Sequence, residues 1–315
     1  MSNHAAVLVV GYQRPKEMRL ILTQVSTAGI KSVYLSIDAP RVTSPDALSR
    51  SEEIRQLAQE FESKFDNFFV RFLPENVGCA ANILSACDWA FASENELVIL
   101  EDDCIPNDDF FVYVDFALKK LSEDQEVLLV CGTQFNPSEK SESFVIKSHY
   151  SLTWGWATTK SNWGLMRKSF EQDSRSFKTD LVTFDYEKIY WSEGARRAID
   201  GYVDVWDTVL VDNLVRHQGY AFLPSQNLVK NVGNDAVATH TGLDENWVNT
   251  DTGSFKPELG TKVVLGTEND LWLKENFFNI RPRHLFSTRV TRIRDKMRRP
   301  TFEPLKTRWE NASRF

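Results

Sequence analysis

The sequence predicts an α/β protein whose main sheet is mostly parallel and carries helices on both faces. Short apolar runs alternate with segments of helical periodicity over residues 5–131, which is the pattern of repeated βαβ units. These runs are apolar at nearly every position, as expected for strands that are covered on both sides. With 315 residues, of which 42% are hydrophobic and 26% charged, the chain can bury one large core or two smaller ones.

The expected elements follow in order along the first half. Five short apolar runs are expected to be strands: 5–10, 32–37, 68–73, 97–100 and 127–131. Four segments with helical spacing of apolar residues are expected to be helices: 15–29, 47–64, 79–93 and 108–121. Pro15 suits the first turn of a helix, because the N–H group that proline lacks would have no partner there.

The second half differs in composition. From about Thr133 the chain becomes rich in aromatic residues, as in SLTWGWATTKSNWGLM at 151–166. We expect short strands and two or three helices there, packed on the first sheet with no linker between the halves. Residues 231–270 are rich in Gly, Asn, Thr and Asp, which predicts a long mobile loop that closes over a ligand.

Charge and cysteine content narrow the function classes. The formal net charge of −7 argues against a general nucleic-acid-binding surface. The first apolar run is too short for a signal peptide, and no later segment is long enough to span a membrane. The four cysteines, Cys79, Cys87, Cys104 and Cys131, form no CxxC pair and lack zinc-site spacing. They are expected to be buried thiols in a reducing, cytoplasmic compartment.

The C-terminal segment HLFSTRVTRIRDKMRRP has the pattern of a basic amphipathic helix. Its apolar stripe consists of Phe286, Val290, Ile293 and Met297. Four basic residues surround this stripe: Arg289, Arg292, Lys296 and Arg299. Two interpretations stay open, namely a helix that lies on the inner, anionic surface of a membrane and a solvated helix that packs on its own domain.

An acidic triplet stands at the end of the fourth expected strand, in LVILEDDCIP. Adjacent carboxylates repel one another unless a positive charge or water offsets them. Mg²⁺ and Mn²⁺ prefer oxygen ligands and bind one or two carboxylates together with substrate phosphates. On an extended strand end, Glu101 and Asp103 would point one way and Asp102 the other. The alternative is a loop whose charge favours the positive end of the next helix.

Polar or glycine-containing turns follow the other strands as well, at Gly11–Arg14, Asp38 and Asn76–Gly78. The carboxyl ends of parallel strands meet at one edge of a sheet, where ligands of α/β proteins bind. We therefore expect these turns and the acidic triplet to share one rim.

Seven motifs occur in a characteristic order: VLVVGYQRP, SIDAPR, NVGCAANI, LVILEDDCIP, SLTWGWATTKSNW, VDVWD and LPSQNLVKNVGNDAVATHTG. From about residue 5 to 243 this set resembles GT-A-fold glycosyltransferases, especially the bacterial family 2-like enzymes of polysaccharide gene clusters. It is more distantly similar to the inverting N-acetylglucosaminyltransferase that begins complex N-glycan branching. The resemblance implies a Rossmann-like nucleotide-sugar half (1–132) and an acceptor-binding, catalytic half (133–270). The basic extension (271–315) lies outside it.

The resemblance also implies a reaction, which is metal-dependent transfer of a sugar from a nucleotide diphosphate, most simply UDP, to a surface glycan or lipid-linked glycan. Mn²⁺ or Mg²⁺ would be the cofactor, bound by Asp103 and approached by His240. An inverting transfer needs a carboxylate base. Asp207 is the first candidate for that base and Asp204 the second, although both could instead cap a helix.

The remaining residues have binding roles under this interpretation. Asp38 would accept the imide N–H of a uracil-type base, and Glu101 and Asp102 would contact ribose or a water near the metal. The predicted nucleotide pocket consists of Gly11, Arg14, Asp38, Asn76, Gly78, Asn82, Glu101 and Asp102. The acceptor wall would be formed by Trp154 and Trp156, because aromatic faces suit the C–H side of a sugar.

Two other functions are compatible with the same features. A sugar nucleotidyltransferase would also combine a parallel sheet with acidic metal ligands, but it usually has a glycine-rich loop after the first strand, whereas GYQRP has one glycine and a proline. A non-catalytic, membrane-associated sugar-binding protein would lack metal-dependent affinity for nucleotides. The DTGS sequence at 251–254 lies in a polar context and does not indicate an aspartic protease.

Overall fold

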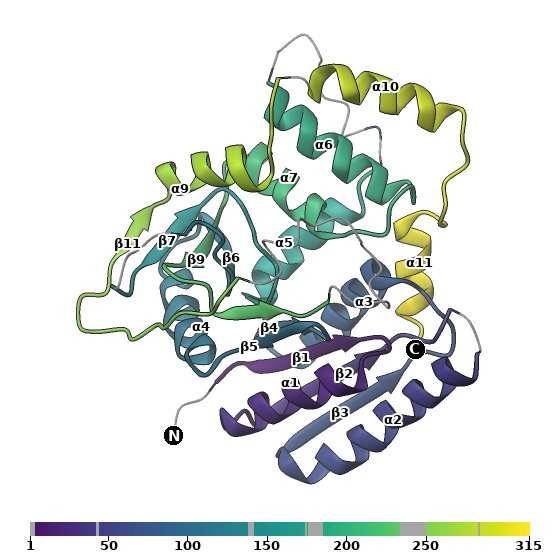
Figure 1. The fold of residues 1–315 in the computed structure, drawn as a ribbon, viewed down its shortest axis with the longest axis vertical. Coiled ribbons are helices and arrows are strands. Elements are labelled where there is room, and N and C mark those ends of the chain that lie inside the picture. The colour runs from purple at the N-terminus through teal and green to yellow at the C-terminus, as the bar shows by residue number, and fades with distance from the viewer. Residues whose placement is uncertain are drawn as a thin grey trace.

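The computed structural model describes residues 4–41, 44–137, 142–173, 175, 185–233, 250–282 and 284–315. Within these residues a nine-stranded sheet crosses the molecule, and a two-stranded ribbon lies beside it (Figure 1). The strands are β1 (Ala6–Gly11), β2 (Ser32–Ile37), β3 (Asn67–Phe72), β4 (Glu96–Glu101), β5 (Cys104–Pro106), β6 (Val127–Cys131), β7 (Val145–Ser148), β8 (Trp156–Thr159), β9 (Tyr220–Pro224), β10 (Val229–Asn231) and β11 (Val263–Leu265).

The strand order confirms a mostly parallel sheet. It runs β11-β7-β9-β6-β8-β4-β1-β2-β3, and the ribbon pairs β10 with β5. The four strands β3, β2, β1 and β4 are mutually parallel. Beyond them β8 is antiparallel to both β4 and β6, so the sheet becomes mixed where the aromatic half begins. The two halves of the chain therefore contribute strands to one continuous sheet.

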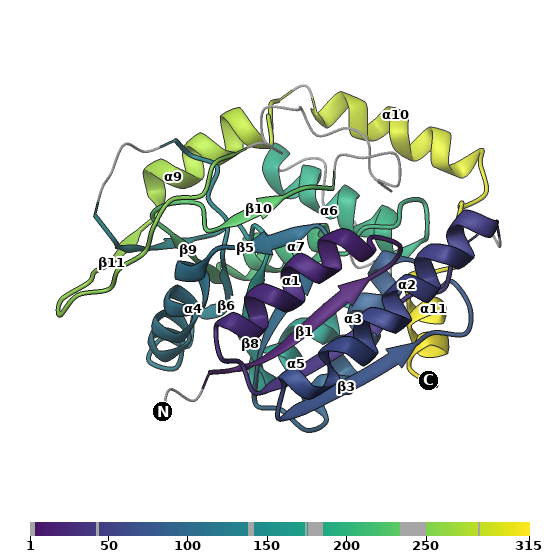
Figure 2. The same cartoon turned by 60° about the horizontal axis from the view of Figure 1, so that its bottom comes forward.

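Helices cover both faces of this sheet (Figures 1 and 2). They are α1 (Pro15–Thr27), α2 (Pro45–Phe61), η1 (Glu62–Lys64), α3 (Cys79–Phe91), α4 (Asp108–Leu121), α5 (Lys160–Phe170), α6 (Tyr186–Ile199), α7 (Asp207–His217), α9 (Thr267–Trp272), the π-helical turn η3 (Leu273–Phe277), α10 (His284–Lys296) and α11 (Leu305–Ala312). Helices α1, α2 and α4 pack on one face, and α3, α5, α7 and α11 pack on the other.

Strand β1 shows why the sequence of this sheet is apolar throughout. Val7 and Val9 are buried against α1 and α2, whereas Leu8 and Val10 are buried against α3. Successive side chains of a strand point to opposite faces, so a strand covered on both sides needs no polar position. Each such side chain contributes about 1.5–3 kcal/mol by its removal from water.

Local polar groups set where the helices begin. Pro15 is the first residue of α1, as predicted. Ser44 accepts a hydrogen bond from the N–H of Ala47 at the start of α2, and Asn107 accepts one from Phe110 at the start of α4. A side-chain oxygen in this position satisfies one of the backbone N–H groups that a helix end leaves without a partner.

The long-loop prediction for 231–270 is partly wrong. Residues 263–265 form β11, which pairs with β7 at the edge of the sheet, and α9 begins at Thr267. The short apolar segment VVL gains backbone hydrogen bonds at that edge, which local composition does not reveal. Residues 234–249 lie outside the described part of the chain. No helix in that described part is long and apolar enough to cross a membrane.

Candidate functional site

The carboxyl ends of β1, β2 and β4 meet at one edge of the sheet. Gly11 is in register with Ile37 of β2, and the preceding Val10 is in register with Glu101 of β4. The N–H of Asp38 donates to the carbonyl of Gly11 at 2.9 Å. The predicted site turns after these strands are therefore neighbours in space, and we call this edge the carboxyl rim.

Arg14 joins two of the three acidic residues at the carboxyl rim. Its Nη1 donates to Asp102 at 2.9 Å and to Asp103 at 3.2 Å. Asp102 also accepts the N–H of Tyr12 at 2.7 Å. The prediction that Asp102 points away from Asp103 is wrong, because β4 ends at Glu101 and the next two residues form a turn that breaks the alternation of a strand.

Negative charge accumulates at the carboxyl rim. Burial and, to a smaller extent, the charges of Asp103, Asp207 and Asp102 raise the pKa of Glu101 to about 8. Burial also raises the pKa of Asp102 to about 6, although Arg14 opposes that shift. Four carboxyl groups are thus close enough to repel one another, which favours binding of a cation.

Asp103 suits a hard divalent cation. Its side chain is 21% exposed, whereas that of Asp102 is 7% exposed. Gly233 lies against its carboxylate, where a Cβ atom would collide with Oδ2. Among the described residues, no three His, Cys, Asp or Glu side chains are grouped to hold a metal ion. A site there would combine Asp103 with phosphate oxygens of a ligand, as is common for Mg²⁺. The predicted ligand His240 lies outside the described residues.

Asp38 organises the turn at residues 76–78. Its carboxylate accepts the backbone N–H groups of Ala39, Val77 and Gly78 at 2.9–3.0 Å, and also the side-chain amide of Asn76 at 3.0 Å. Burial nevertheless raises its pKa to about 6. A carboxylate has about four acceptor positions, so direct contact with a nucleobase would require a ligand group to replace one of these donors.

Asp204 lies in a buried ion pair that includes the C-terminal extension. Arg308 of α11 donates from Nη1 to Asp204 Oδ1 at 2.8 Å, and Arg41 donates to the other oxygen at 3.3 Å. The N–H of Cys79, at the start of α3, also donates to Asp204 at 3.1 Å. This carboxylate therefore holds the amino end of α3 in place. Its oxygens are therefore poorly available to a substrate hydroxyl.

Gly78 is required where these groups meet. Its φ is +86°, a backbone conformation that side chains other than glycine rarely adopt. A Cβ atom there would lie 2.5 Å from an oxygen of Asp204 and 2.6 Å from Nη1 of Arg308. The glycine lets the turn approach both charged groups closely. Glycine is therefore required here for two reasons, the positive φ and the lack of space for a Cβ atom, whereas an ordinary turn requires only the first.

Replacing Arg308 with alanine is expected to lower the free energy of unfolding by roughly 3 kcal/mol, because it leaves a buried carboxylate short of a partner. The affinity for a nucleotide should fall as well, since the turn at residues 76–78 loses its support. Urea denaturation and calorimetry with UDP measure the two effects. Lys306→Ala is the matched control, because Lys306 is 56% exposed on the same helix. Equal stability of both variants would contradict this role.

Asp207 lies at the first position of α7 and is partly exposed. Its carboxylate accepts the N–H of Thr208 at 2.8 Å. Asp207 therefore satisfies a backbone N–H group at the start of the helix, which is the capping role that the sequence left open. Its charge also raises the pKa values of Glu101 and Tyr190, so Asp207 lies within electrostatic range of Glu101 at the end of β4. The helix end therefore brings one carboxylate toward the acidic rim.

Two predicted pocket residues are buried in the core. Asn82 is 1% exposed and accepts a hydrogen bond from Ser36 at 2.6 Å, beneath the rim. Trp156 is 0% exposed and packs 5.3 Å from Trp206. The predictions that Asn82 lines the nucleotide pocket and that Trp156 forms an acceptor wall are therefore wrong. Trp154 is partly exposed and remains a candidate for that wall.

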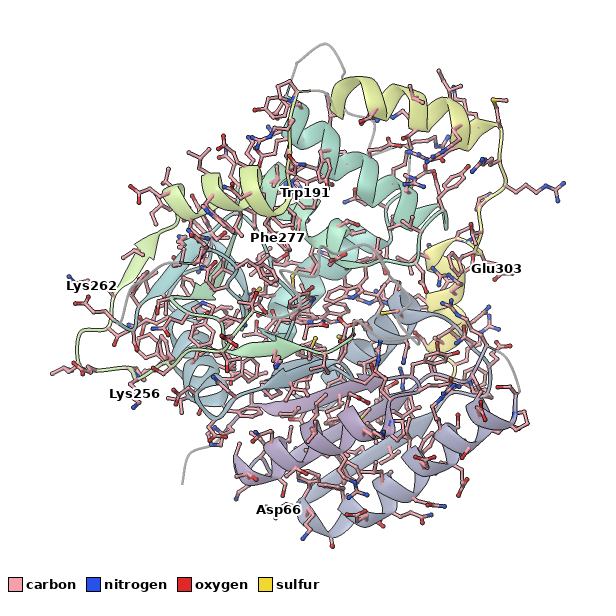
Figure 3. All side chains as sticks on the ribbon, viewed as in Figure 1. Asp66, Trp191, Lys256, Lys262, Phe277 and Glu303 are labelled. Carbon is pink, nitrogen blue, oxygen red and sulfur yellow. The ribbon has the colours of Figure 1, made fainter. Side chains whose placement is uncertain are left out.

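Glycine explains why the two tryptophans differ. Gly155 has a φ of +68°, so the chain turns between Trp154 and Trp156 instead of continuing as a strand. Trp154 packs at 4.9 Å against Phe135, which stacks at 4.2 Å on Phe277. The next residue, Phe278, packs edge-on at 4.7 Å against Trp191 of α6, and Figure 3 labels Phe277 and Trp191 in this aromatic region. The dense aromatic composition of the second half thus builds mainly core.

Replacing Trp156 with alanine is expected to lower the free energy of unfolding by about 3–5 kcal/mol, because it leaves a large cavity in a packed core. Trp154→Ala should cost much less, since that side chain is partly exposed. Equilibrium denaturation in urea compares the two variants. A Trp154 variant that is destabilised as strongly as the Trp156 variant would assign both residues to the core.

The apo protein should become less stable as pH rises from about 4.5 to about 8, which are the ordinary and shifted pKa values of Glu101. A raised pKa means that the native state holds a proton that the unfolded state has lost, so unfolding is favoured as pH increases in this range. Glu101→Gln removes this contribution and should raise the melting temperature above pH 8 relative to wild type. Near pH 4 the two proteins should differ little. A difference in melting temperature between the two proteins that does not change with pH would contradict the raised pKa of Glu101.

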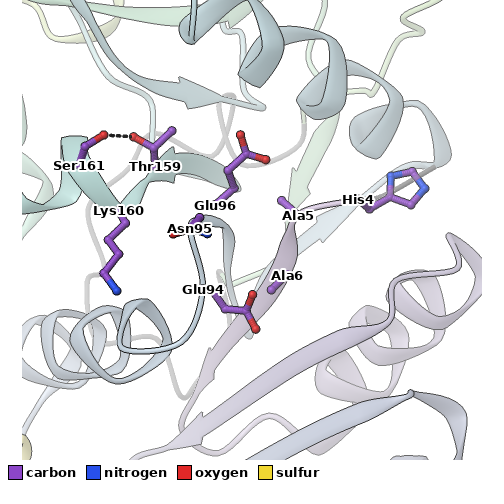
Figure 4. Close-up of a pocket in the computed structure, with 9 residues that line it drawn as sticks. All are labelled: His4, Ala5, Ala6, Glu94, Asn95, Glu96, Thr159, Lys160 and Ser161. Carbon is purple, nitrogen blue, oxygen red and sulfur yellow. Dashed lines mark hydrogen bonds between the residues drawn. The ribbon is translucent and has the colours of Figure 1, made fainter. Parts of the chain in front are cut away.

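A separate hollow of about 660 Å³ lies at the opposite edge of the sheet (Figure 4). It is lined by residues at the starts of β1, β4 and α5, including His4, Glu94, Glu96 and Lys160. None of the predicted site residues lines it. Because ligands of open α/β sheets bind beyond the carboxyl ends of strands, the carboxyl rim is the better candidate site.

Three residues of the site were not predicted from the sequence. Tyr12 supplies a backbone N–H to Asp102, and its hydroxyl accepts the N–H of Arg41 at 2.9 Å. Arg308 comes from the far end of the chain. Tyr12 lies within the predicted site turn Gly11–Arg14, so its position in the sequence could have identified it as a site residue. Arg308 lies in a basic tail with no distinguishing pattern, and only the packing of α11 on α3 brings it to the rim.

No protein-family model matches the sequence, and the search of curated proteins gives no significant match. The solved structures that it is similar to include a protein assigned as a glucose-1-phosphate thymidylyltransferase from Bacillus anthracis, in complex with sucrose. That match has 10% identity and a TM-score of 0.31, and it covers 52% of this chain and 75% of the other. Another is 4-diphosphocytidyl-2C-methyl-D-erythritol synthase from Anaerococcus prevotii, with 8% identity, a TM-score of 0.37, and coverage of 78% and 96%.

These comparisons agree with the α/β class that the structure confirms. Both named proteins are nucleotidyltransferases, the class of the alternative prediction, and neither is a glycosyltransferase. At such low identities and TM-scores the likeness carries no argument about reaction or substrate. The α/β class of this chain is shown by its own mostly parallel sheet and the helices that flank it.

Proposed function

We propose that this chain is a transferase that binds a nucleotide sugar at the carboxyl rim and transfers the sugar to a glycan acceptor. The observation that carries the proposal is the group of four interacting carboxyl groups, Glu101, Asp102, Asp103 and Asp207, at the rim of a parallel sheet. Such a site suits a ligand that brings both a cation and phosphates. The resemblance of the sequence motifs to GT-A glycosyltransferases supports a UDP-sugar donor and a surface or lipid-linked glycan as acceptor. The cysteine pattern supports a cytoplasmic site of action.

The residues divide into binding and reacting groups under this proposal. Asp103 would hold Mn²⁺ or Mg²⁺, which neutralises charge on the departing diphosphate when bound. Arg14 restrains Asp102 and Asp103, so their carboxylates keep a fixed arrangement in the absence of ligand. Asp207 would accept the proton of the acceptor hydroxyl as that oxygen attacks the anomeric carbon and the bond to the diphosphate breaks. Attack from the side opposite the diphosphate inverts the anomeric configuration.

Sugar nucleotidyl transfer is the second candidate, because enzymes of that class also combine a parallel sheet with acidic metal ligands at its carboxyl edge. It requires a loop after β1 that can cradle a triphosphate with backbone N–H groups. In this chain the N–H of Tyr12 is bonded to Asp102, and Pro15 has no N–H at the start of α1. Two backbone positions that such a loop would use are therefore not available, which favours glycosyl transfer.

A panel of nucleotide sugars, each with Mn²⁺, tests the proposal. Glycosyl transfer or slow hydrolysis releases a nucleoside diphosphate. Nucleotidyl transfer instead consumes a nucleoside triphosphate and a sugar 1-phosphate and releases pyrophosphate. Release of pyrophosphate without diphosphate would establish the second candidate. Absence of turnover together with metal-independent binding of UDP would indicate a non-catalytic sugar-binding protein.

A further inference from the structure

Helix α10 lies along the outside of α6, at the edge of the molecule (Figures 1 and 2). Its inner side is held by charged groups. Arg292 pairs with Glu193 of α6 at 2.7 Å, and Asp295 pairs with Arg196 of α6 at 2.6 Å. The hydroxyl of Tyr202 donates to the backbone carbonyl of Asp295 at 2.9 Å. Arg292 and Asp295 of this helix thus face the protein.

The apolar residues of α10 face outward. Val290 is 49% exposed, Ile293 is 62% exposed, and Met297, directly after the helix, is 81% exposed. Their spacing places them on one stripe, which the sequence predicted. A helix at a protein surface normally turns its apolar stripe toward the core and its charges toward water. Here that orientation is reversed, so packing on its own domain does not account for the stripe.

Basic side chains surround the outward stripe. The exposed cations are Arg294, Lys296, Arg298 and Arg299. Between residues 284 and 300 the sequence has one acidic residue, Asp295, and it is buried against α6. Although the whole chain has a formal charge of −7, this surface is cationic. We call these exposed residues, three apolar and four basic, the α10 outer face.

We propose that the α10 outer face docks the protein on the anionic surface of a lipid bilayer. A bilayer surface accepts apolar side chains below its headgroups and attracts lysine and arginine at the headgroup level. Long basic side chains can also keep their charge in the headgroups while their methylene groups lie deeper. A nucleic acid would complement the charge alone, with no use for the apolar stripe. Such docking would bring the carboxyl rim close to acceptors carried on lipid, but it is independent of the proposed reaction.

Vesicle binding by the full chain tests this proposal without donor or metal. We expect binding to vesicles of phosphatidylcholine and phosphatidylglycerol at low salt that is at least about tenfold tighter than binding to phosphatidylcholine alone. Added NaCl should weaken this binding, because salt screens exposed charges. Cosedimentation over a range of lipid concentrations measures both effects.

Two variants separate the apolar and electrostatic contributions. Ile293→Ser combined with Met297→Ser should weaken binding by about tenfold, through lost apolar burial. Arg298→Ala combined with Arg299→Ala should weaken it by about tenfold or more and reduce its salt dependence. The matched control is Leu20→Ser combined with Leu48→Ser, which changes exposed leucines of α1 and α2. Circular dichroism and melting temperature verify that each variant is folded.

Four results would overturn the proposal. The first is no binding to anionic vesicles at low salt, and the second is binding that none of the α10 variants changes. The third is a dimer that the Ile293 and Met297 variant disrupts, with no affinity for vesicles, which would make a second copy of the chain the occupant of this face. Retention of a duplex oligonucleotide in place of vesicles would equally reject a lipid partner.

Discussion

Replacing Asp103 with asparagine is expected to reduce glycosyl transfer by roughly a thousandfold, equivalent to about 4 kcal/mol of transition-state stabilisation. The amide keeps the shape of the side chain but removes the negative charge that a divalent cation requires. Affinity for UDP in the presence of Mn²⁺ should fall to the value measured without Mn²⁺. Calorimetry with and without the cation, together with a turnover assay, measures both quantities.

Asp108→Asn is the matched control for this variant. Asp108 is an exposed acidic residue in the same segment, at the first position of α4. Its replacement removes the same formal charge, so a general electrostatic effect would appear in both variants. An Asp103 variant that keeps metal-dependent UDP binding would remove Asp103 from the metal site.

Replacing Asp207 with asparagine is expected to lower kcat by about 100- to 10,000-fold and to leave the affinity for the donor nearly unchanged. The amide can still lie at the first position of α7, but it cannot accept the proton of an acceptor hydroxyl. Steady-state kinetics should therefore show a fall in kcat without an increase in KM for the nucleotide sugar.

Asp204→Asn should behave differently, because Asp204 pairs with Arg41 and Arg308 and holds the start of α3. Its loss should lower stability and donor affinity together. A fully active Asp207 variant, combined with an Asp204 variant that loses only kcat, would reverse the assignment of the base. This comparison also distinguishes a catalytic carboxylate from one that acts on the position of a helix.

The α/β class and the carboxyl rim could be predicted because they depend on local pattern. Continuous apolar runs indicate parallel strands that are covered on both faces, and the turn residues that follow such strands must meet at the carboxyl edge of the sheet. Gly11, Asp38 and Glu101 lie there as expected. The family 2-like glycosyltransferase assignment and the individual site roles stay proposals, since they depend on a ligand-bound geometry that a strand pattern does not specify.

What failed in the prediction depended on single turns or on distant contacts. The turn after Glu101 brings Asp102 and Asp103 to one guanidinium, and the positive φ of Gly155 separates Trp154 from the buried Trp156. Strand alternation cannot anticipate either change of direction, because each arises at one residue.

The sequence by itself determined the elements, their order and the edge of the sheet at which polar groups collect, since hydrophobic periodicity and chain order suffice for these. Only the tertiary structure decided that Arg308 reaches Asp204 and that α10 turns Arg292 and Asp295 toward α6. Both outcomes depend on ion pairs between residues about one hundred positions apart. A local pattern has no information about which distant charge will be near, because that depends on how the whole chain packs.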